Sequence, residues 1–253
     1  MIVCKSPAEI ERMRTASALV GEVLAGLAAM VAPGVSTQDL DIEAERLVRA
    51  AGAEPAFKGY RGYPCTLCAS TNDEVIHGIP SKRPLVEGDI VSLDMGVKQH
   101  GFFGDSAVTV PVGRVSEQAQ LLLKVTQESL EKGIAQVRLG GRVSDIGHAI
   151  QQHVEAHGFS IVREFVGHGI GASLHEDPQI ANYGEPGRGP RLAEGMTLAI
   201  EPMVNVGRPG VKMMADGWTA VTRDGSLSAH FEHTVAVSKN GPVVLTRATA
   251  RVR

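Results

Sequence analysis

Cysteines and long apolar runs are both scarce in this sequence. The three cysteines, Cys4, Cys65 and Cys68, are few and odd in number, which argues against a disulfide framework and for a reducing compartment. Residues 1–15 carry charges throughout and do not resemble a secretory signal. The longest apolar stretch, Val23 to Ala32, is about ten residues long, whereas a membrane-spanning helix needs about 20. We therefore expect a cytoplasmic protein that contacts no membrane.

A strong charge of either sign is also missing. The net charge is −3 over 253 residues, and 43% of the residues are hydrophobic and 21% charged. This composition is that of an ordinary globular protein. It gives no electrostatic reason to expect specific binding of nucleic acid or of an anionic membrane. The length is compatible with one large domain or two small ones.

What the sequence does contain is an internal repeat. Two segments that begin at Glu87 and Glu194 read as apolar strands, and they end in the carboxylates Asp94 and Glu201. Asp94 lies seven residues after Glu87, and Glu201 lies seven residues after Glu194. The two acids therefore occupy the same place in the repeat, 201 − 94 = 107 positions apart. An unpaired carboxylate among buried aliphatic side chains is costly. Two at equivalent positions therefore predict a shared counter-charge, most simply a bound metal.

Two pairs of helices repeat with nearly the same offset. The 3.6-residue spacing of apolar residues and the capping residues predict helices over residues 6–33 and 37–52, and again over 116–140 and 144–158. Ser6, Ser116 and Ser144 are the expected N-caps. No Pro- or Ser-rich linker separates the repeats, which cover about 6–112 and 116–240. We expect one α+β domain over residues 1–253, with two halves facing each other across a pseudo-twofold axis.

Each half carries a second acid, which is expected at the start of an alternating strand, in the first half over Asp105–Val112. Asp105 follows Asp94 by eleven residues, and Glu232 follows Glu201 by thirty-one. Between them, His168 stands in a Gly-His-Gly-Ile-Gly run, whose glycines would let the backbone approach a ligand closely. Four carboxylates and a neutral histidine balance two divalent cations, and this set favours Mn, Fe(II), Co or Zn in a dinuclear site. Such a pair of metals generates hydroxide near neutral pH, so metal-assisted hydrolysis is the predicted reaction.

These residues stand in motifs that resemble the type I methionine aminopeptidases, which have the pita-bread fold. The resemblance covers nearly the whole chain, through Val75–Pro80, Asp94, Gly104-Asp105, Gly167–Gly171, Leu174–Pro178, Ile200–Met203 and Phe231–Thr234. It implies that Asp94 binds one metal and that His168 and Glu201 bind the other. Asp105 and Glu232 would bridge both metals.

The resemblance also implies roles for side chains around the metals. His77 would contact the substrate backbone, His175 would stabilise the developing oxyanion, and Glu201 would also shuttle a proton. The pocket for the methionine side chain would be lined by Tyr60, Tyr63, Cys68 and Trp218, which suit a thioether. Leu174 stands where the family has an aromatic residue, so this wall is expected to be looser. A monovalent cation held by backbone carbonyls near Asn72 and Ser228 is a further implication.

The implied activity is removal of the initiator methionine from nascent polypeptides, most readily before a small second residue. The sequence has no zinc-finger or Pro-rich extension and no large insertion before Glu201. It therefore resembles the minimal bacterial form, for which a monomer and transient contact with ribosomes are expected.

Two alternatives stay open. One is an Xaa-Pro peptidase of the same fold, whose members usually carry another N-terminal domain. The other is a non-catalytic peptide- or ribosome-binding module, which would be expected to have lost metal ligands.

Two further patterns have structural interpretations. Cys65 and Cys68 have CxxC spacing, but no second pair accompanies them, so neither a redox nor a zinc site is predicted. His153 and His157 lie one turn apart on a helix whose apolar face is formed by other residues. They are expected on a solvated face.

Overall fold

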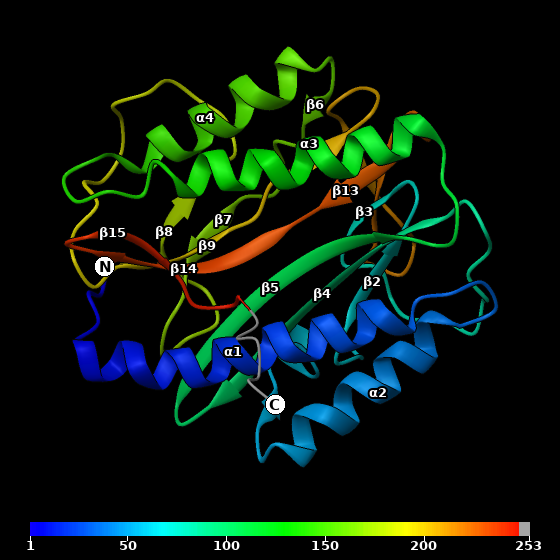
Figure 1. Ribbon diagram of the computed structural model, residues 1–253, viewed down its shortest axis with the longest axis horizontal. Helices are drawn as coiled ribbons and strands as arrows, with labels where there is room; N and C mark the ends of the chain where they lie inside the picture. The colour runs from blue at the N-terminus through cyan, green and yellow to red at the C-terminus, as the bar shows by residue number, and fades with distance from the viewer. Residues whose placement is uncertain (248–253) are drawn as a thin grey trace.

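The computed structural model describes residues 1–247, and a sheet runs through its centre (Figure 1). Its long strands are β4 (Ile90–Gln99), β5 (Phe102–Pro111) and β14 (Glu232–Ser238). The shorter strands are β1 (Glu54–Pro55), β2 (Cys68–Thr71), β3 (Glu74–Ile76), β6 (Ser160–Ile161), β7 (Gly167–Gly169), β8 (Glu176–Ile180), β9 (Thr197–Ile200), β10 (Met203–Asn205), β11 (Val211–Met213), β12 (Ala220–Thr222), β13 (Ser228–His230) and β15 (Gly241–Val244).

The main sheet joins both halves of the repeat. Its strand order is β1-β4-β5-β14-β9-β7-β8, with β2 paired to β4 and β15 paired to β14. Strands β4 and β5 form an antiparallel hairpin, and β9 pairs antiparallel with β14. The two halves meet where β5 pairs with β14. Two three-stranded sheets, β13-β10-β6 and β11-β12-β3, complete the fold.

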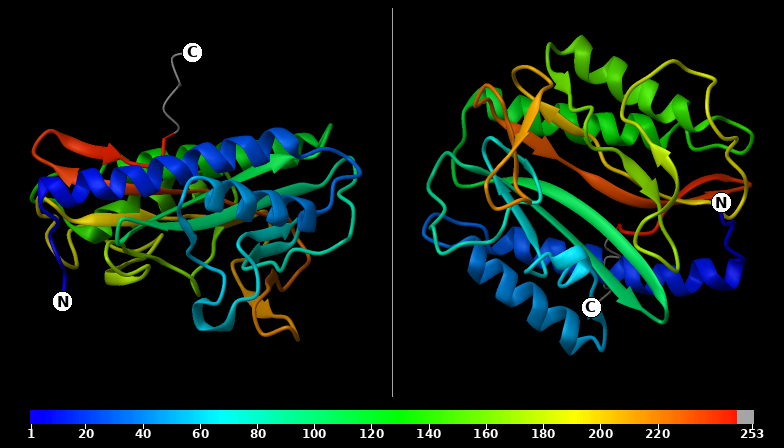
Figure 2. Two further views of the ribbon diagram at one scale, coloured as in Figure 1. Left: turned by 90° about the horizontal axis from the view of Figure 1, so that it is seen from below. Right: turned by 180° about the vertical axis from the view of Figure 1, so that it is seen from behind.

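Four helices also follow the repeat. They are α1 (Pro7–Met30), α2 (Thr37–Ala50), α3 (Glu117–Ile134) and α4 (Val143–Ala156). Helix α1 lies along β4 and β5, whereas α3 lies beside β14 and packs on α4 (Figure 1). The left view of Figure 2 shows α1 and α3 on one side of the sheet, with loops projecting on the other side. The expected repeat of two helices and a strand pair is thus present in three dimensions.

A hydrophobic core fills the space between helices and sheet in each half. In the first half, Val20 and Leu27 of α1 pack with Leu93 and Met95 of β4. In the second half, the residues that pack together include Val125, Leu130, Ile146, Ile150, Leu198 and Val235. Among the described residues, only α1 is long and apolar enough by composition to cross a membrane. Its apolar side is buried against the sheet, so the core accounts for that composition.

Three local predictions were wrong. Ser144 does not cap α4, because the Asp145 carboxylate accepts the N–H of Arg142, which is the N-cap. The Ser144 hydroxyl instead accepts the N–H of Arg188 at 2.7 Å. Helix α3 ends at Ile134 and not near residue 140, because turn hydrogen bonds at 136 and 137 follow it.

The third difference concerns the hairpin before Asp105. The turn is confined to residues 100 and 101, so Asp105 is the fourth residue of β5 and not the first. Gly104 lies within the strand, directly under α1. A Cβ at Gly104 would lie 2.6 Å from the Cα of Ser17, so only glycine lets the helix pack this closely on β5.

Candidate active site

The five predicted metal ligands lie on five neighbouring strands. Asp94 is on β4, Asp105 on β5, Glu232 on β14, Glu201 directly after β9, and His168 on β7. This is the order of those strands across the sheet. Side chains alternate between the two faces of a strand. The neighbours of Asp94 pack under α1 in the core, so the acid itself points to the other face.

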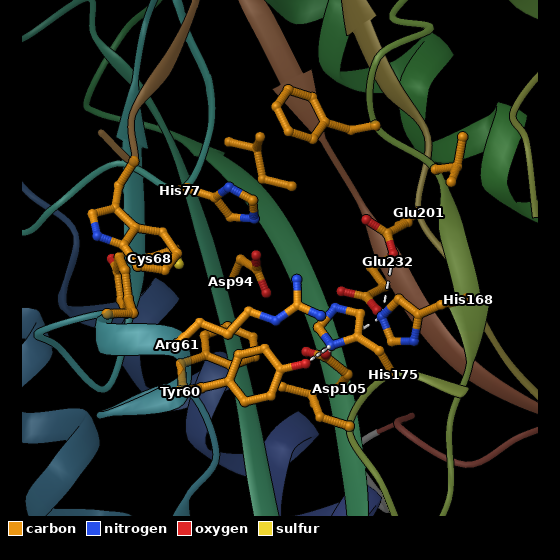
Figure 3. A pocket seen from close by; sticks show the side chains of 17 residues that line it. Tyr60, Arg61, Cys68, His77, Asp94, Asp105, His168, His175, Glu201 and Glu232 are labelled. Atoms are coloured by element: carbon orange, nitrogen blue, oxygen red, sulfur yellow. Dashed lines mark hydrogen bonds and ion pairs between the residues drawn. The ribbon is translucent and has the colours of Figure 1, made fainter. Parts of the chain in front are cut away.

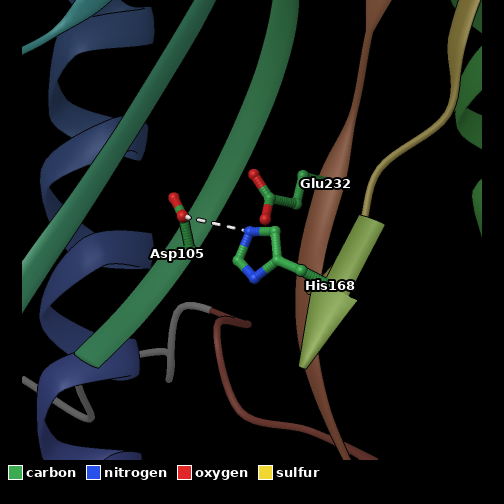
Figure 4. A group of neighbouring side chains, drawn as sticks. All are labelled: Asp105, His168 and Glu232. Carbon is green, nitrogen blue, oxygen red and sulfur yellow. Dashed lines mark ion pairs between the residues drawn. The ribbon is translucent and has the colours of Figure 1, made fainter. Parts of the chain in front are cut away.

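The side chains converge at the centre of the sheet. The Nε2 atom of His168 lies 3.5 Å from Oε1 of Glu201 and 4.0 Å from Oδ2 of Asp105. Ligand atoms of Asp105, His168 and Glu232 all lie within 4.8 Å of one another (Figure 4). His168 Nδ1 is 2.9 Å from the carbonyl oxygen of Gly169. A proton on Nδ1 can be donated to that carbonyl, which leaves the Nε2 lone pair facing the carboxylates.

The carboxylates in this cluster lack the partners that buried acids normally have. Asp94, Asp105, Glu201 and Glu232 are all buried. Within residues 1–247, Asp94 Oδ1, Asp105 Oδ1 and Glu232 Oε1 accept no hydrogen bond, and no Lys or Arg pairs with any of the four acids. Buried charges without a partner are strongly destabilising. The donor set therefore fits divalent metal ions, which would supply the missing positive charge.

The pKa values point to the same ligand class. Burial raises the pKa of Asp94 to about 8. Burial, and then repulsion from neighbouring carboxylates, raises the pKa of Asp105, Glu201 and Glu232 well above the usual range. Burial lowers the pKa of His168 to about 4, so this imidazole is neutral at pH 7. A neutral imidazole beside acids that need a counter-charge is a ligand set for a cation.

Hydrogen bonds between strands hold the ligands in register. The Thr234 hydroxyl accepts the N–H of Asp105 at 3.1 Å and donates to its carbonyl at 2.8 Å. Ser106 Oγ donates to the carbonyl of Glu232 at 2.6 Å, and Asn182 Nδ2 donates to the carbonyl of Glu201 at 3.1 Å. Nothing in the sequence indicated these contacts, because they depend on which strands become neighbours.

Two histidines flank Glu232 and face different ways. His230 is fully buried, and its Nε2 lies 4.0 Å from Glu201 Oε2. Within the described residues this Nε2 forms no hydrogen bond. His233 points away, with Nδ1 2.8 Å from the Thr246 hydroxyl. His233 is the direct sequence neighbour of the predicted ligand Glu232, yet it is His230 that lies beside Glu201. The i, i+2 spacing of His230 and Glu232 was the available signal, since such residues share a face of an extended segment.

A pocket opens beside the acids. It is a cavity of ≈ 190 Å³ whose lining includes Tyr60, Tyr63, Cys68 and Trp218, as well as the acids (Figure 3). The Tyr63 and Trp218 rings meet edge to face with centroids 5.1 Å apart. Leu174 also lines the cavity and is only 2% exposed. Further apolar lining residues that the sequence did not indicate are Phe57, Ile76, Phe165 and Val166.

The two histidines predicted around the metals also line this pocket. His77 packs edge to face on Phe165, with centroids 5.6 Å apart, and burial lowers its pKa to about 4. His175 is 4.2 Å from the His168 ring and places Nδ1 2.9 Å from the Tyr60 hydroxyl. Burial, and then the charge of Arg61, lowers the pKa of His175. Both imidazoles are therefore neutral hydrogen-bonding groups at pH 7.

The glycines around His168 have a different role from the one expected. A Cβ on Gly167 would lie 2.3 Å from the carbonyl oxygen of Ala199, and a Cβ on Gly169 would lie 2.1 Å from that of Asp177. The close approach is therefore to neighbouring backbone, not to a ligand. These glycines let β7 pack between β8 and β9, which carries His168 to the acids.

The remaining motifs agree only in part with the sequence analysis, because the side chain of His153 is 17% exposed and so is not on a fully solvated face. Cys65 and Cys68 are both free thiols, and Cys68 is buried in the pocket wall. His153 bonds to Glu128 at 3.1 Å, and His157 Nδ1 lies 2.8 Å from the carbonyl oxygen of His153. His157 is exposed.

Comparisons with known proteins identify the family of this chain. Residues 11–239 match the model of metallopeptidase family M24. The chain is 53% identical to a methionine aminopeptidase of Clostridium acetobutylicum over 97% of this chain and 99% of that protein. It is also 53% identical to methionine aminopeptidase 1 of Bacillus subtilis over 98% of this chain and 100% of that protein.

Solved structures give the same result. The crystal structure of methionine aminopeptidase from Thermotoga maritima has a TM-score of 0.96 at 48% identity, covering 98% of this chain and all of that one. An Xaa-Pro dipeptidase from Bacillus anthracis shares the fold, with a TM-score of 0.78 at 21% identity over 97% of this chain and 62% of its own. The expected α+β pita-bread fold is thereby confirmed. The chain belongs to metallopeptidase family M24 and, within it, to the type I methionine aminopeptidases.

Proposed function

We propose that this protein hydrolyses the peptide bond after an N-terminal methionine, acting on nascent polypeptides whose second residue is small. The observation that carries the proposal is the cluster of buried, unpaired carboxylates at one end of an apolar pocket. The pocket suits an uncharged thioether side chain, and the acids lie where a backbone amide beyond that side chain would be held. The high identity to methionine aminopeptidases supports this reaction.

Two divalent cations would complete the site. In this proposal Asp94 would hold one, His168 and Glu201 would hold the other, and Asp105 and Glu232 would contribute to holding both. When bound, such ions supply Lewis acidity and activate water near neutral pH. Mn, Fe(II), Co and Zn all suit the donor set, so availability would decide which is used.

The protein's own side chains would bind, orient and transfer protons. The neutral imidazoles of His77 and His175 can hydrogen-bond the substrate backbone, and His175 would stabilise the oxyanion as it develops. The Tyr60 hydroxyl fixes the ring of His175 through Nδ1. Glu201 would carry the proton from water to the leaving amine. Tyr63, Cys68 and Trp218 would enclose the methionine side chain.

The broader features of the protein are also part of the proposal. We expect residues 1–253 to act as one catalytic domain, as a cytoplasmic monomer that meets new chains at the ribosome. A monovalent cation near Asn72 and Ser228 would be held by backbone carbonyls. These two residues are neighbours, since the N–H of Ser228 donates to the carbonyl of Asn72 at 2.8 Å.

Release of the N-terminal residue from two peptides tests the reaction. Met-Ala-Ser and Ala-Pro peptides are incubated with chelated protein, and then with added Mn, Co, Fe(II) or Zn. We expect cleavage of Met-Ala-Ser only, and only with added metal. Cleavage of Ala-Pro would instead assign an Xaa-Pro peptidase. No cleavage of either, with no metal bound, would leave a peptide-binding module.

A further inference from the structure

The pocket contains one cation that the proposed reaction does not use. Among its seventeen lining residues, all within residues 1–247, Arg61 is the sole Lys or Arg (Figure 3). The acids and most apolar wall residues are buried or half-buried, whereas Arg61 and His175 are exposed. Arg61 therefore lies at the opening of the pocket, beside His175.

The backbone and the Tyr60 ring place Arg61 there. It lies in the short 3-10 turn Tyr60–Gly62, between glycines 59 and 62, and its own φ is 49°. The guanidinium stacks over the Tyr60 ring at 5.4 Å from the centroid. Tyr60 in turn contacts His175. The charge is thus held next to a group that faces the reacting bond.

This charge has no carboxylate partner in the part of the chain that the structure describes. The nearby Lys58, by contrast, pairs with Glu45 at 2.6 Å. Since divalent cations would balance the four acids deeper in the site, the charge of Arg61 remains for a ligand. A guanidinium forms strong, often bidentate hydrogen bonds with carboxylates.

The direction of the substrate follows from the proposed function, on which this inference rests. With methionine in the apolar part of the pocket and its amide beside the acids, the rest of the polypeptide has to leave through the opening. That path passes Arg61. We propose that Arg61 is a specificity-determining residue that favours substrates with a negative charge in the first few residues after the cleaved bond.

The size of the preference follows from the exposure of Arg61. Solvent-exposed ion pairs change an equilibrium by up to about fivefold. The contact between Arg61 and the substrate charge is distant from the reacting atoms, so it would stabilise the ground state and the transition state equally. It should therefore change KM and leave kcat unchanged.

The test measures kcat and KM on amidated Met-Ala-Xaa-Ser peptides in which Xaa is Glu, Gln or Lys. The wild-type protein with added metal should prefer Glu over Gln and Gln over Lys, each by about two- to fivefold in KM. Arg61→Gln should remove the preference, and Arg61→Glu should invert it. Residue 61 has a φ of 49°. Gln and Glu have a Cβ as Arg does, so neither replacement should strain this backbone conformation more than Arg61 does.

A matched control changes the same charge elsewhere. Arg163 is also exposed, lies two residues from the lining residue Phe165, and stacks on Tyr183 outside the pocket. Arg163→Glu should leave the order Glu, Gln, Lys unchanged. An equal shift in Arg163→Glu would assign the effect to the overall charge and overturn the proposal, as would an unchanged order in Arg61→Glu.

The negative charge that Arg61 binds could be an acidic side chain or the C-terminal carboxylate of a short peptide. Comparing Met-Ala-Gln-Ser that has a free C-terminal carboxylate with its amide distinguishes the two. Preference for the free acid alone would limit Arg61 to short peptides and overturn the role on long substrates. Absence of methionine release from every peptide would refute the proposed function, whereas release without any charge dependence would refute only this inference.

Discussion

At the scale of single residues, burial without a partner is what separates the acids of the site from ordinary acids. Glu43 pairs with Arg46, and Glu45 pairs with Lys58 and Arg49, and these cations lower the pKa of both acids. The pKa of Asp94 and Asp105 is raised instead, because their surroundings exclude water and offer no cation. Such a position is costly to maintain unless a ligand is bound there.

Replacing Asp105 by asparagine tests the metal role with almost no change of shape. We expect metal content, measured by elemental analysis after dialysis, to fall, and activity to drop by more than about 100-fold, since even outer contacts of a metal contribute 10- to 100-fold. The metal-free variant should not unfold more easily, because a repulsive charge has been removed. Glu128→Gln, at an exposed acid of α3, is the control. Full metal content and turnover in Asp105→Asn would contradict the site.

Tyr60→Phe tests how His175 is oriented. The substitution removes the hydroxyl that lies 2.9 Å from Nδ1 and keeps the ring that stacks on the imidazole. We expect kcat to fall by about 3- to 10-fold with little change in KM, since a neutral hydrogen bond contributes about 1 kcal/mol. Tyr183→Phe, on a ring outside the pocket lining, is the control. A change confined to KM would mean that Tyr60 only binds substrate.

At the scale of elements, the segment before α1 is tied to the segment that carries His175. Lys5 and Glu176 form an ion pair at 2.5 Å, with side-chain exposures of 4% and 13%. The N–H of Lys5 also donates to the carbonyl of Gly195. Glu176 follows His175 directly, so this contact joins the N-terminal segment to the pocket.

Lys5→Met should lower the free energy of unfolding by about 3–5 kcal/mol, because it removes the buried cation that pairs with the largely enclosed carboxylate of Glu176. The measurement is urea unfolding of the metal-free protein. Lys5→Met combined with Glu176→Gln should be less destabilised than the single variant, since no unpaired charge remains. Lys239→Met, which breaks the exposed pair with Glu194, should change stability by less than about 1 kcal/mol. Equal effects at Lys5 and Lys239 would show that burial does not matter here.

Asp224 gives a pH-dependent contribution to the loop between β12 and β13. The N–H of Arg208 and the hydroxyl and N–H of Ser226 lower its pKa to about 2. A lowered pKa means that the ionised acid stabilises the fold above its usual pKa of about 3.9, and that this contribution is lost as the pH falls towards 2.

Asp224→Asn should therefore lower the melting temperature at pH 7, and the difference from wild type should shrink between pH 4 and pH 2. Thermal unfolding at several pH values measures this. A difference that stays constant down to pH 2 would mean that the charge of Asp224 contributes nothing.

At the scale of the whole molecule, both halves supply ligands to one site, so metal binding should stabilise the entire fold. A ligand present at 100 times its Kd stabilises the folded state by about 2.7 kcal/mol. We expect chelation to lower the melting temperature in scanning calorimetry and added Mn to restore it. The melting temperature of Asp105→Asn should not respond to either treatment. An equal response in both proteins would place the stabilising ion elsewhere.

The sequence by itself determined the repeat and the order of the helices, and it predicted the ligand set. The nearly equal offsets of Asp94 and Glu201, and of the helices before them, follow from local periodicity and from capping residues such as Ser6. These features act over a few residues and can be recognised along the chain. The resemblance to a known family then supplied the proposed roles of His77 and His175, which periodicity does not indicate.

The tertiary structure decided what depends on neighbours distant in sequence. It placed His230, and not His233, beside Glu201, and it put Arg61 at the opening of the pocket. It also gave the glycines around His168 a packing role. The physical reason is that burial, strand pairing and close approach depend on which segments pack together. In this chain some of those segments are more than a hundred residues apart, such as those of Asp105 and Thr234.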